Sequence, residues 1–323
     1  MIRVALIGIG GMGNGHFNAF KSVKNAKIVA VADPRMDMAR EKVNDESIKI
    51  YPDMEKLLNN EEIDMVDICT PTYMHIPLAI KALEMGKHVL SEKPMSVSSR
   101  DTQMVINAAK KCGKKYMVAH VVRFLPAYVA LKNVIDSGEL GELVHLDMQR
   151  LSGLPRWNWE SWMMDTTKSG GCTIDMAIHD IDFAQYAFGL PKEINGVYQK
   201  MRDDNDYITA NLIYDRFSVT ITGGWYNYAF PFRMTYLAVF QNGFMEFKAD
   251  GSLVKNGEPF DVSKPVEEED TGMNLKGFAG YSDEIQYFVD CINEDKEVTA
   301  VMPESSQTSI KLAEEIMEKA VKL

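Results

Sequence analysis

Val4-Ala5-Leu6-Ile7-Gly8-Ile9-Gly10-Gly11-Met12-Gly13 stands near the start of the chain and decides its fold. Four apolar residues predict a buried strand, and the glycines behind them predict a tight turn into a helix. In such a loop one glycine permits the turn, one lets the backbone approach a pyrophosphate, and one allows close packing of helix on strand. The amino terminus of the helix adds N–H donors and the positive end of its dipole. The stretch therefore predicts a dinucleotide site at Gly8, Gly10, Gly11, Met12 and Gly13.

The residues that follow this loop repeat the same alternation of strand and helix. Short apolar strands are expected at 4–7, 28–32, 65–69, 88–90 and 116–119, and amphipathic helices at 12–22, 35–43, 76–85 and 99–111. Gly86 and Gly113 stand where two of these helices should end. Apolar strands that alternate with helices are typical of a doubly wound parallel sheet. We therefore expect an α/β dinucleotide-binding domain over residues 1–120.

The second half of the sequence has a different pattern. After a helix at 126–137 closed by Gly138, strands are expected at 207–214, 217–221, 234–240 and 244–248, and Asn242-Gly243 predicts a hairpin between the last two. Residues 250–276 look like a loop with an edge strand at most, and Pro303 opens a final helix. We expect a second α/β domain over 121–323 with a large, mostly antiparallel open sheet. Its last helix, 303–322, can pack back on the first domain.

Composition and charge narrow the class of protein. The chain has 323 residues, enough for two domains, and a net charge of −11, which argues against nucleic acid or an anionic membrane as the main partner. Four widely spaced cysteines without a Cys-x-x-Cys pair favour reduced thiols in a cytoplasmic protein. The six histidines show no metal-ligand spacing, so no metal site is expected.

Asp33 ends the second predicted strand, twenty residues beyond Gly13. A carboxylate there can accept hydrogen bonds from both hydroxyls of the adenosine ribose and repel a 2′-phosphate. Asp33 is followed by a proline, so it can also be a simple turn residue. The guanidinium of Arg35 could bind the 2′-phosphate. The pattern favours NAD over NADP, with NADP still open.

Asp175 and His179 are four residues apart in a segment that predicts a helix over 173–188. At that spacing the two side chains share one face, which Asp182 and Tyr186 continue. A carboxylate beside an imidazole is a common way to fix the tautomer and basicity of a working histidine. The same stripe can equally be a polar face in water.

Lys93 lies in Ser91-Glu92-Lys93-Pro94, directly after a predicted strand. Ligands of open α/β sheets gather at the carboxyl ends of strands. A lysine held there can stabilise an alkoxide that forms as a hydride leaves. Most lysines are solvated surface residues, so the tetrapeptide by itself does not decide the matter.

The order of these motifs resembles that of the glucose–fructose oxidoreductase, inositol dehydrogenase and rhizopine-catabolism (Gfo/Idh/MocA) family. The resemblance covers residues 1 to about 190. It rests on the glycine loop, Asp33, Thr70-Pro71-Thr72 with His75, Glu92-Lys93-Pro94, Arg123-Phe124 with Pro126, and Asp175-x3-His179. It implies an amino-terminal Rossmann domain and a carboxyl-terminal α/β domain, one face of whose open sheet makes subunit contacts. A homodimer or homotetramer is expected on the same ground.

The resemblance also implies roles for individual residues. Asp33 and Arg35 would meet the adenosine ribose, while Thr70, Pro71, His75, Glu92 and Lys93 would line the nicotinamide end. Lys93, His179 and Asp175 would be the catalytic group, the last two approaching from the second domain. Arg123, Trp157 and Trp159 are weaker candidates for substrate contacts, together with Asp175 and His179. Arg123 could equally pair with an acidic neighbour, and at least one tryptophan could belong to the core.

The function that the resemblance implies is hydride transfer between NAD(P) and a secondary alcohol of a sugar, cyclitol or sugar derivative. His179 would take the hydroxyl proton and Lys93 would stabilise the alkoxide, although these two roles can be exchanged. One alternative is transient oxidation of a glycoside that leads to its cleavage while the cofactor is recycled. Another is a non-enzymatic protein that binds dinucleotide and signals to a regulatory partner.

Overall fold

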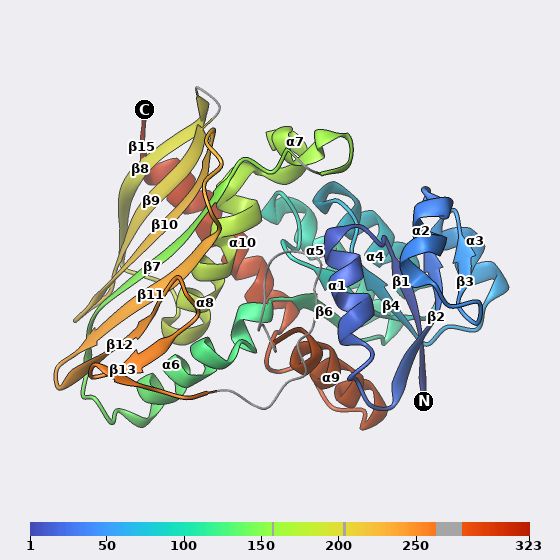
Figure 1. Cartoon of the computed structure of the whole chain (residues 1–323), viewed down its shortest axis with the longest axis horizontal. Coiled ribbons are helices and arrows are strands. Elements are labelled where there is room, and N and C mark those ends of the chain that lie inside the picture. Colours follow the sequence, from blue (N-terminus) through green and yellow to red (C-terminus); the bar gives the residue numbers. More distant parts are fainter. Residues whose placement is uncertain (157, 203–204, 263–279) are drawn as a thin grey trace. The chain divides into compact units, whose positions relative to one another are not determined.

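A computed structural model describes residues 1–156, 158–202, 205–262 and 280–323 (Figure 1). The chain forms two compact units. Unit 1 contains Met1–Ser96, Arg100–Phe124 and, of Pro265–Gln307, the described residues 280–307. Unit 2 contains Val97–Ser99, the described residues of Leu125–Lys264, and Thr308–Leu323. The predicted domain ranges, 1–120 and 121–323, stay a prediction.

Unit 1 is built on a six-stranded, wholly parallel sheet. Its strands are β1 (Ile2–Ile7), β2 (Ala26–Ala32), β3 (Lys49–Tyr51), β4 (Met65–Ile68), β5 (His88–Glu92) and β6 (Tyr116–Ala119). Their order is β3-β2-β1-β4-β5-β6, that of a dinucleotide-binding Rossmann sheet. Every residue of β4 and β6 is buried, as expected for a parallel sheet covered on both faces. The predicted doubly wound sheet is confirmed.

The helices of unit 1 lie between successive strands of this sheet, except for one that comes much later in the chain. They are α1 (Gly11–Ala19), α2 (Met36–Val43), α3 (Met54–Asn60), α4 (His75–Glu84), α5 (Ser99–Cys112) and α9 (Gly280–Asn293), with short 3₁₀ turns η1 (Thr72–Met74) and η2 (Val121–Arg123). Gly86 and Gly113 follow α4 and α5 with φ of 76° and 61°, the left-handed conformation that ends a helix. Neither β3 nor α3 was expected from the sequence, and α9 was missed too.

Unit 2 is built on a nine-stranded, mostly antiparallel sheet. The strands are β7 (Leu143–Gly153), β8 (Glu193–Arg202), β9 (Asn205–Ile213), β10 (Ser218–Tyr226), β11 (Arg233–Phe240), β12 (Gly243–Phe247), β13 (Leu253–Lys255), β14 (Glu258–Pro259) and β15 (Val321–Lys322). Among the described strands of this sheet, only the β7–β10 and β8–β15 pairs are parallel. The sheet confirms the second half of the predicted fold class.

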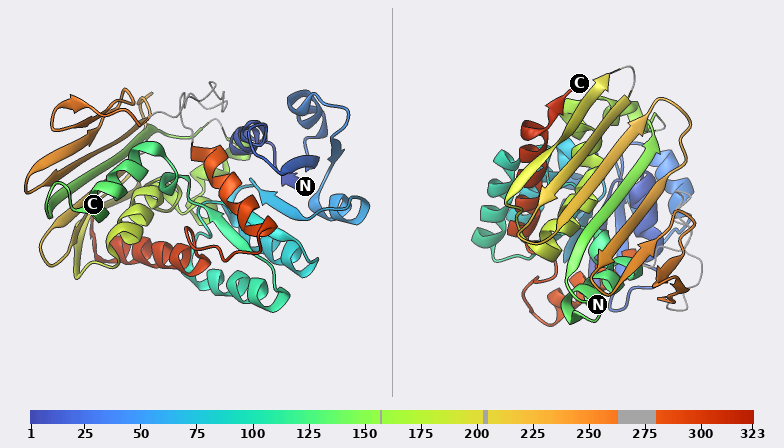
Figure 2. Two further views of the ribbon diagram at one scale, coloured as in Figure 1. Left: turned by 90° about the horizontal axis from the view of Figure 1, so that it is seen from below. Right: turned by 90° about the vertical axis from the view of Figure 1, so that its left-hand side faces the viewer.

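The helices of unit 2 lie on one face of this sheet. They are α6 (Pro126–Ser137), η3 (Trp159–Met164), α7 (Thr166–Ser169), the π-helix η4 (Thr173–Ala177), α8 (Ile178–Phe188) and α10 (Pro303–Lys319), whose first residues belong to unit 1. Tyr128, Phe183 and Tyr236 are fully buried between α6, α8 and the sheet, with ring centroids 5.1 and 5.3 Å from Tyr128. Figure 2 (right) shows the opposite face of the sheet, which no helix of the described residues covers.

The predicted hairpin between β11 and β12 is present, but its turn differs by one residue. Phe240 pairs with Gly243, so Gln241-Asn242 forms the turn and Gly243 begins β12. Gly243 serves a close approach instead, because a Cβ there would lie 2.1 Å from Oδ1 of Asn256. That oxygen accepts the Phe244 N–H at 2.9 Å.

None of the helices in the described part of the chain is both long and apolar enough to cross a bilayer.

Candidate active site

The glycine loop joins the carboxyl end of β1 to α1 and is shaped by backbone contacts. Gly8 has φ of 86°, and a Cβ there would lie 2.7 Å from the Cys69 carbonyl oxygen. A Cβ on Gly13 would lie 2.0 Å from the carbonyl oxygen of Gly8. Gly10 differs, since the nearest atom to its Cβ would be Nη2 of Arg35 at 3.9 Å. No side chain of the described residues caps α1 at Gly10. Gly11 and Met12 open the helix, so the loop offers N–H donors over an open glycine backbone, which fits a pyrophosphate.

Asp33 follows β2 at the same edge of the sheet, and its carboxylate is fully occupied. Oδ1 accepts the backbone N–H and the Nε–H of Arg35, both at 2.9 Å. Oδ2 accepts Nη2 of Arg35 at 2.9 Å and the Ile9 N–H at 3.1 Å. Burial raises the pKa of Asp33, but the hydrogen bonds from Arg35 and Ile9 outweigh it and lower the pKa below its ordinary value. A carboxylate accepts about four hydrogen bonds, so a ribose hydroxyl has to displace one of these donors.

Lys42 on α2 is a third charged group at this loop, and sequence reasoning missed it. Its ammonium donates to the carbonyl oxygens of Ile9 and Gly10 at 3.0 and 3.1 Å. Burial and the Arg35 charge lower the pKa of Lys42. The only signal available was its place seven residues beyond Arg35, on the helix that follows β2.

The segment after β4 is held by a buried histidine. His75 begins α4, and its Nδ1 and Nε2 each lie 2.9 Å from a carbonyl oxygen, of Pro94 and Thr70 respectively. The two carbonyl oxygens act to raise the pKa of His75, but burial outweighs them and lowers it below its ordinary value. His75 therefore joins Thr70 and Pro71 to the turn after β5.

Lys93 lies at the carboxyl end of β5, one strand from β4. Its backbone N–H donates to Oε2 of Glu92 at 2.9 Å, and the Lys93–Pro94 peptide bond is cis. Glu92 is buried, so its carboxylate does not line an open surface. The structure thus brings the predicted residues after β1, β2, β4 and β5 to one edge of the sheet. Their roles stay predictions.

His16 is a buried histidine that the sequence analysis did not select. Its Nδ1 lies 2.9 Å from Oδ2 of Asp67, and its Nε2 lies 3.0 Å from Oε1 of Glu92. Burial lowers the pKa of His16, but Asp67 and Cys69 raise it, and the pKa ends well above its ordinary value. His16, Asp67 and Cys69 also have ligand atoms within 4.8 Å of one another. Spacing along the sequence could not reveal this cluster, since its members come from α1 and from β4 and its end. The available signal was Asp67, a charge inside an apolar strand.

Asp175 and His179 lie in unit 2, in a helical segment that begins as a π-helix. Asp175 belongs to η4 and is buried, and His179 is half-buried in the first turn of α8. Single π turns often occur at functional sites, because they displace side chains from the regular helical positions. The predicted helix over 173–188 is therefore present, with a change of winding between the two residues.

The sequence left open that Asp175, His179, Asp182 and Tyr186 form a polar face in water. That alternative is wrong for most of these residues. Asp182 is buried and accepts the Ser309 hydroxyl at 2.7 Å, and only Tyr186 is exposed. Asp180, next to His179, is also buried and accepts Nη2 and Nε of Arg150 at 2.8 and 3.1 Å. These contacts fasten α8 to α10 and to β7.

Asp206 on β9 holds the start of the same segment. Its Oδ2 accepts the N–H of Cys172, the residue before η4, at 2.7 Å. Burial raises the pKa of Asp206 to about 6, although the bond from Cys172 acts in the other direction. Gly171 is required here, since a Cβ would lie 2.5 Å from that oxygen.

The weaker substrate candidates fall in three different settings. Arg123 is buried in unit 1, where Nη1 donates to the Ala300 carbonyl and Nη2 to the Ser305 hydroxyl, each at 2.8 Å. Those two contacts hold η2 to Ala300 and to the first turn of α10. Trp159 is partly exposed in η3. Trp157 lies outside the described residues.

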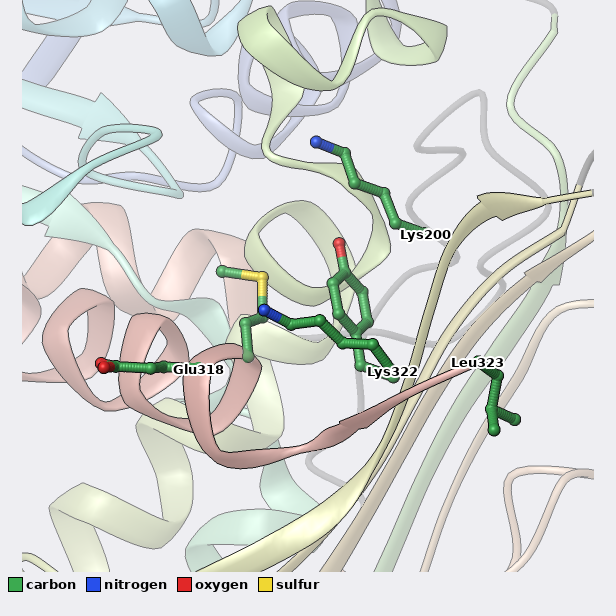
Figure 3. A pocket seen from close by; sticks show the side chains of 6 residues that line it. Lys200, Glu318, Lys322 and Leu323 are labelled. Carbon is green, nitrogen blue, oxygen red and sulfur yellow. The ribbon is translucent and has the colours of Figure 1, made fainter.

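A cavity of about 470 Å³ lies elsewhere in unit 2. Figure 3 shows Lys200 and Lys322 reaching along it from β8 and β15, with Glu318 on α10 and the terminal Leu323 nearby. None of the predicted site residues lines it, so we do not assign it to the active site.

Two family descriptions match the chain. The oxidoreductase family with an NAD-binding Rossmann fold (Gfo/Idh/MocA) matches residues 2–120, and the GFO/IDH/MocA C-terminal domain matches residues 128–243. The scyllo-inositol 2-dehydrogenase (NAD(+)) of Bacillus subtilis is 35% identical over 191 residues, 58% of this chain and 54% of the relative. The myo-inositol 2-dehydrogenase of Thermotoga maritima is 30% identical over 199 residues, 61% of this chain and 57% of the relative. The chain thus spans little more than half the length of these relatives.

A solved structure extends the likeness to nearly the whole fold. The crystal structure of myo-inositol 2-dehydrogenase from Lactobacillus plantarum is 20% identical, with a TM-score of 0.80 over 98% of this chain and 96% of that one. The matched domains, their order and the fold agree with the motifs of the sequence. The chain belongs to the Gfo/Idh/MocA oxidoreductase family.

Proposed function

We propose that the protein oxidises a secondary alcohol of a cyclitol or sugar reversibly, with NAD as hydride acceptor. One observation carries the proposal: the glycine loop after β1 and the Lys93 turn after β5 lie at the same edge of the sheet of unit 1. The reactive end of a bound dinucleotide and an alcohol-binding group are thereby expected at neighbouring strand ends.

The chain supplies a binding surface for the cofactor. Gly8, Gly10, Gly11, Met12 and Gly13 would hold the pyrophosphate, and Asp33 with Arg35 would meet the adenosine ribose. Thr70, Pro71, His75 and Glu92 would shape the nicotinamide end. NAD, when bound, supplies the carbon that accepts the hydride.

The proton is handled by side chains. His179 takes the hydroxyl proton of the substrate as general base, and the ammonium of Lys93 stabilises the oxygen while negative charge develops on it. Asp175 positions His179 or the substrate. Asp175 is buried. Buried carboxylates are usually held in one orientation by hydrogen-bond donors, so this burial supports a positioning role.

The names of the relatives support a substrate class. The two sequence relatives described above are named for scyllo-inositol and myo-inositol, so cyclitols are the first candidates here. Arg123, Trp157 and Trp159 remain candidate substrate contacts. A homodimer or homotetramer in the cytoplasm is the proposed working form, and the four free cysteines are consistent with reduced thiols.

The test is a screen of purified protein with NAD against myo-inositol, scyllo-inositol, hexoses, amino sugars and uronates, followed by NADH absorbance. We expect NADH and a carbonyl product in equal amounts with at least one cyclitol. Lys93→Met and His179→Ala should each lower turnover by about a hundredfold or more. The exposed Lys27→Met and His88→Ala, at the start of β5, serve as matched controls.

Other results would contradict the proposal. Consumption of a glycoside without net NADH would favour redox-assisted cleavage, and NAD binding without turnover of any compound would favour a regulatory protein. Near-normal turnover in both the Lys93 and His179 variants would overturn the residue assignment.

A further inference from the structure

A buried histidine joins the helix of the glycine loop to the strand that carries Lys93. His16 lies on α1, Asp67 on β4 and Glu92 at the end of β5. The exposed fractions of the three residues are 0%, 0% and 4%. Each ring nitrogen of His16 faces a different carboxylate, at 2.9 Å for Asp67 and 3.0 Å for Glu92. Hydride transfer as proposed above makes no use of this arrangement.

The geometry fits an imidazolium. A neutral imidazole has one N–H, whereas two ionised carboxylates at its two nitrogens both need a donor. Burial opposes the charge on His16, but Asp67 and Cys69 raise its pKa. Burial also raises the pKa of Glu92, and His16 lowers it below its ordinary value. Both directions favour a charged His16 ring beside a charged Glu92 carboxylate.

The groups around this trio are few. The thiol of Cys69 lies 3.8 Å from Oδ1 of Asp67, and burial raises the pKa of that thiol. The ring of Tyr281 on α9 lies 5.9 Å from the His16 ring. The charge of Lys93 also lowers the pKa of Glu92. His16 is therefore the cation that is hydrogen-bonded to both carboxylates in the described part of this cluster.

Glu92 connects His16 to the turn that contains Lys93. Oε1 faces His16, while Oε2 accepts the backbone N–H of Lys93 at 2.9 Å. On the other side of Lys93, the Pro94 carbonyl lies 2.9 Å from Nδ1 of His75. The backbone of Lys93 is thus tied on both sides, which fixes the direction in which its side chain leaves the chain.

We propose that His16 is a positioning residue for Lys93, because it holds Glu92 in the orientation on which the Lys93 backbone N–H rests. This inference relies on the proposed role of Lys93 in the reaction. Without His16, Glu92 would be a buried carboxylate short of its donor, and it would turn or take up a proton. The Lys93 turn would then lose its fixed geometry, while the glycine loop would keep its own backbone contacts.

The same residues could instead hold a metal ion, and the test includes that outcome. A metal would need one nitrogen of His16 turned away from its carboxylate, together with a Cys69 thiolate. The two short imidazole–carboxylate distances and the raised pKa of the thiol favour the hydrogen-bonded form.

The first measurement needs no substrate. Nitrogen-15 NMR of the histidine rings in the wild-type protein should show His16 with two protonated nitrogens at neutral pH, its signals being assigned by their loss in His16→Gln. A single protonated nitrogen under the same conditions would overturn the inference. So would a stoichiometric metal ion in the purified protein that disappears in His16→Gln.

The second measurement is a double-mutant cycle with the cyclitol that the screen identifies. His16→Gln should lower kcat by roughly ten- to hundredfold, as outer partners of catalytic groups do, with a change of less than about threefold in the Kd for NAD. In a Lys93→Met background the same change should cost less than about twofold, because residues that act through one another are not additive. His88→Gln is the matched control. His88 begins β5, at the opposite end from Glu92, and burial with Lys114 and Lys115 lowers its pKa to about 4.

The outcomes separate the two proposals. An equal loss of kcat from His16→Gln in both backgrounds, or a loss of NAD affinity as large as the loss of kcat, would reduce His16 to a structural residue. Full turnover by Lys93→Met would contradict the proposed role of Lys93 instead, whatever the NMR shows. The absence of any NAD-dependent oxidation by the wild-type protein would contradict the proposed function.

Discussion

The glycine loop contains two glycines that are needed for different reasons. Gly13 is required by the fold, since its Cβ would lie 2.0 Å from the Gly8 carbonyl oxygen. Gly10 has open space over its backbone, with only a flexible guanidinium at 3.9 Å. We therefore expect that the protein alone tolerates a methyl group at Gly10 and that the proposed pyrophosphate site does not.

Gly10→Ala should leave the thermal midpoint within about 2 °C of wild type and weaken NAD binding by about tenfold or more, since overpacking costs about 1–3 kcal/mol. Gly13→Ala should lower the midpoint and the NAD affinity together. Calorimetry with NAD measures both quantities. Unchanged affinity in Gly10→Ala would place the pyrophosphate elsewhere.

Arg35 is expected to govern the choice between NAD and NADP. Arg35 donates three of the four hydrogen bonds that the Asp33 carboxylate accepts. Arg35→Ala removes two of them, frees Asp33 for the ribose hydroxyls and removes the cation nearest a 2′-phosphate. The ratio of kcat/KM for NAD over NADP should rise by about tenfold, the effect of one charge-assisted hydrogen bond. A fall in that ratio would show that Arg35 serves NAD.

At this scale the sequence predicted residues whose signal is local. The glycine loop, Asp33 and Lys93 each stand next to a recognisable strand end. His16, Asp67 and Lys42 were missed, because their partners lie on other elements and no spacing along the chain brings them together. Asp33 was foreseen, but the saturation of its carboxylate by Arg35 was not.

The segment η4–α8 depends on Asp206, which accepts the N–H in front of it. Burial raises the pKa of Asp206 to about 6 from an ordinary 3.8. An acid whose pKa is raised by folding binds its proton more tightly in the native state. Its stabilising effect is complete below about pH 4 and is lost as the pH rises through about 6.

The wild-type protein should lose stability between about pH 4 and 6 as Asp206 ionises, and Asp206→Asn should not. At pH 8 the variant should therefore have a thermal midpoint several degrees above that of wild type. The amide oxygen can still accept the Cys172 N–H. Melting curves from about pH 4 to 8 test this, with the exposed Asp215→Asn as control. A pH slope in Asp206→Asn that equals the wild-type slope would contradict the raised pKa.

Elements with one dominant pattern were predicted well, and mixed ones were not. The range 126–137 for α6 and 116–119 for β6 agree with the structure. β7 was missed since its buried face includes Arg150, whose charge is paired with that of Asp180 in α8. β3 was missed since three residues at a sheet edge give no periodic signal. α9 does carry apolar residues at helical spacing, so its omission was avoidable.

At the scale of the whole molecule, the uncovered face of the nine-stranded sheet is the expected subunit contact. Leu237 on β11 and Val144 on β7 are exposed apolar residues of this sheet. Light scattering should give a dimer or tetramer for wild type, and Leu237→Glu should shift it to a smaller species. Leu190→Glu, in the turn after α8, is the matched control, since Leu190 is more exposed but lies outside the sheet. A monomeric wild-type protein would contradict this expectation.

The proposed reaction is hydride transfer from a carbinol carbon to NAD. The most direct measurement incubates the protein with NAD and C-deuterated myo- or scyllo-inositol and determines the mass of the reduced cofactor. The proposed function predicts one deuterium in the NADH and an equal amount of deuterium-depleted carbonyl product. Deuterium that appears in water, or substrate consumed without any deuterated NADH, would contradict it.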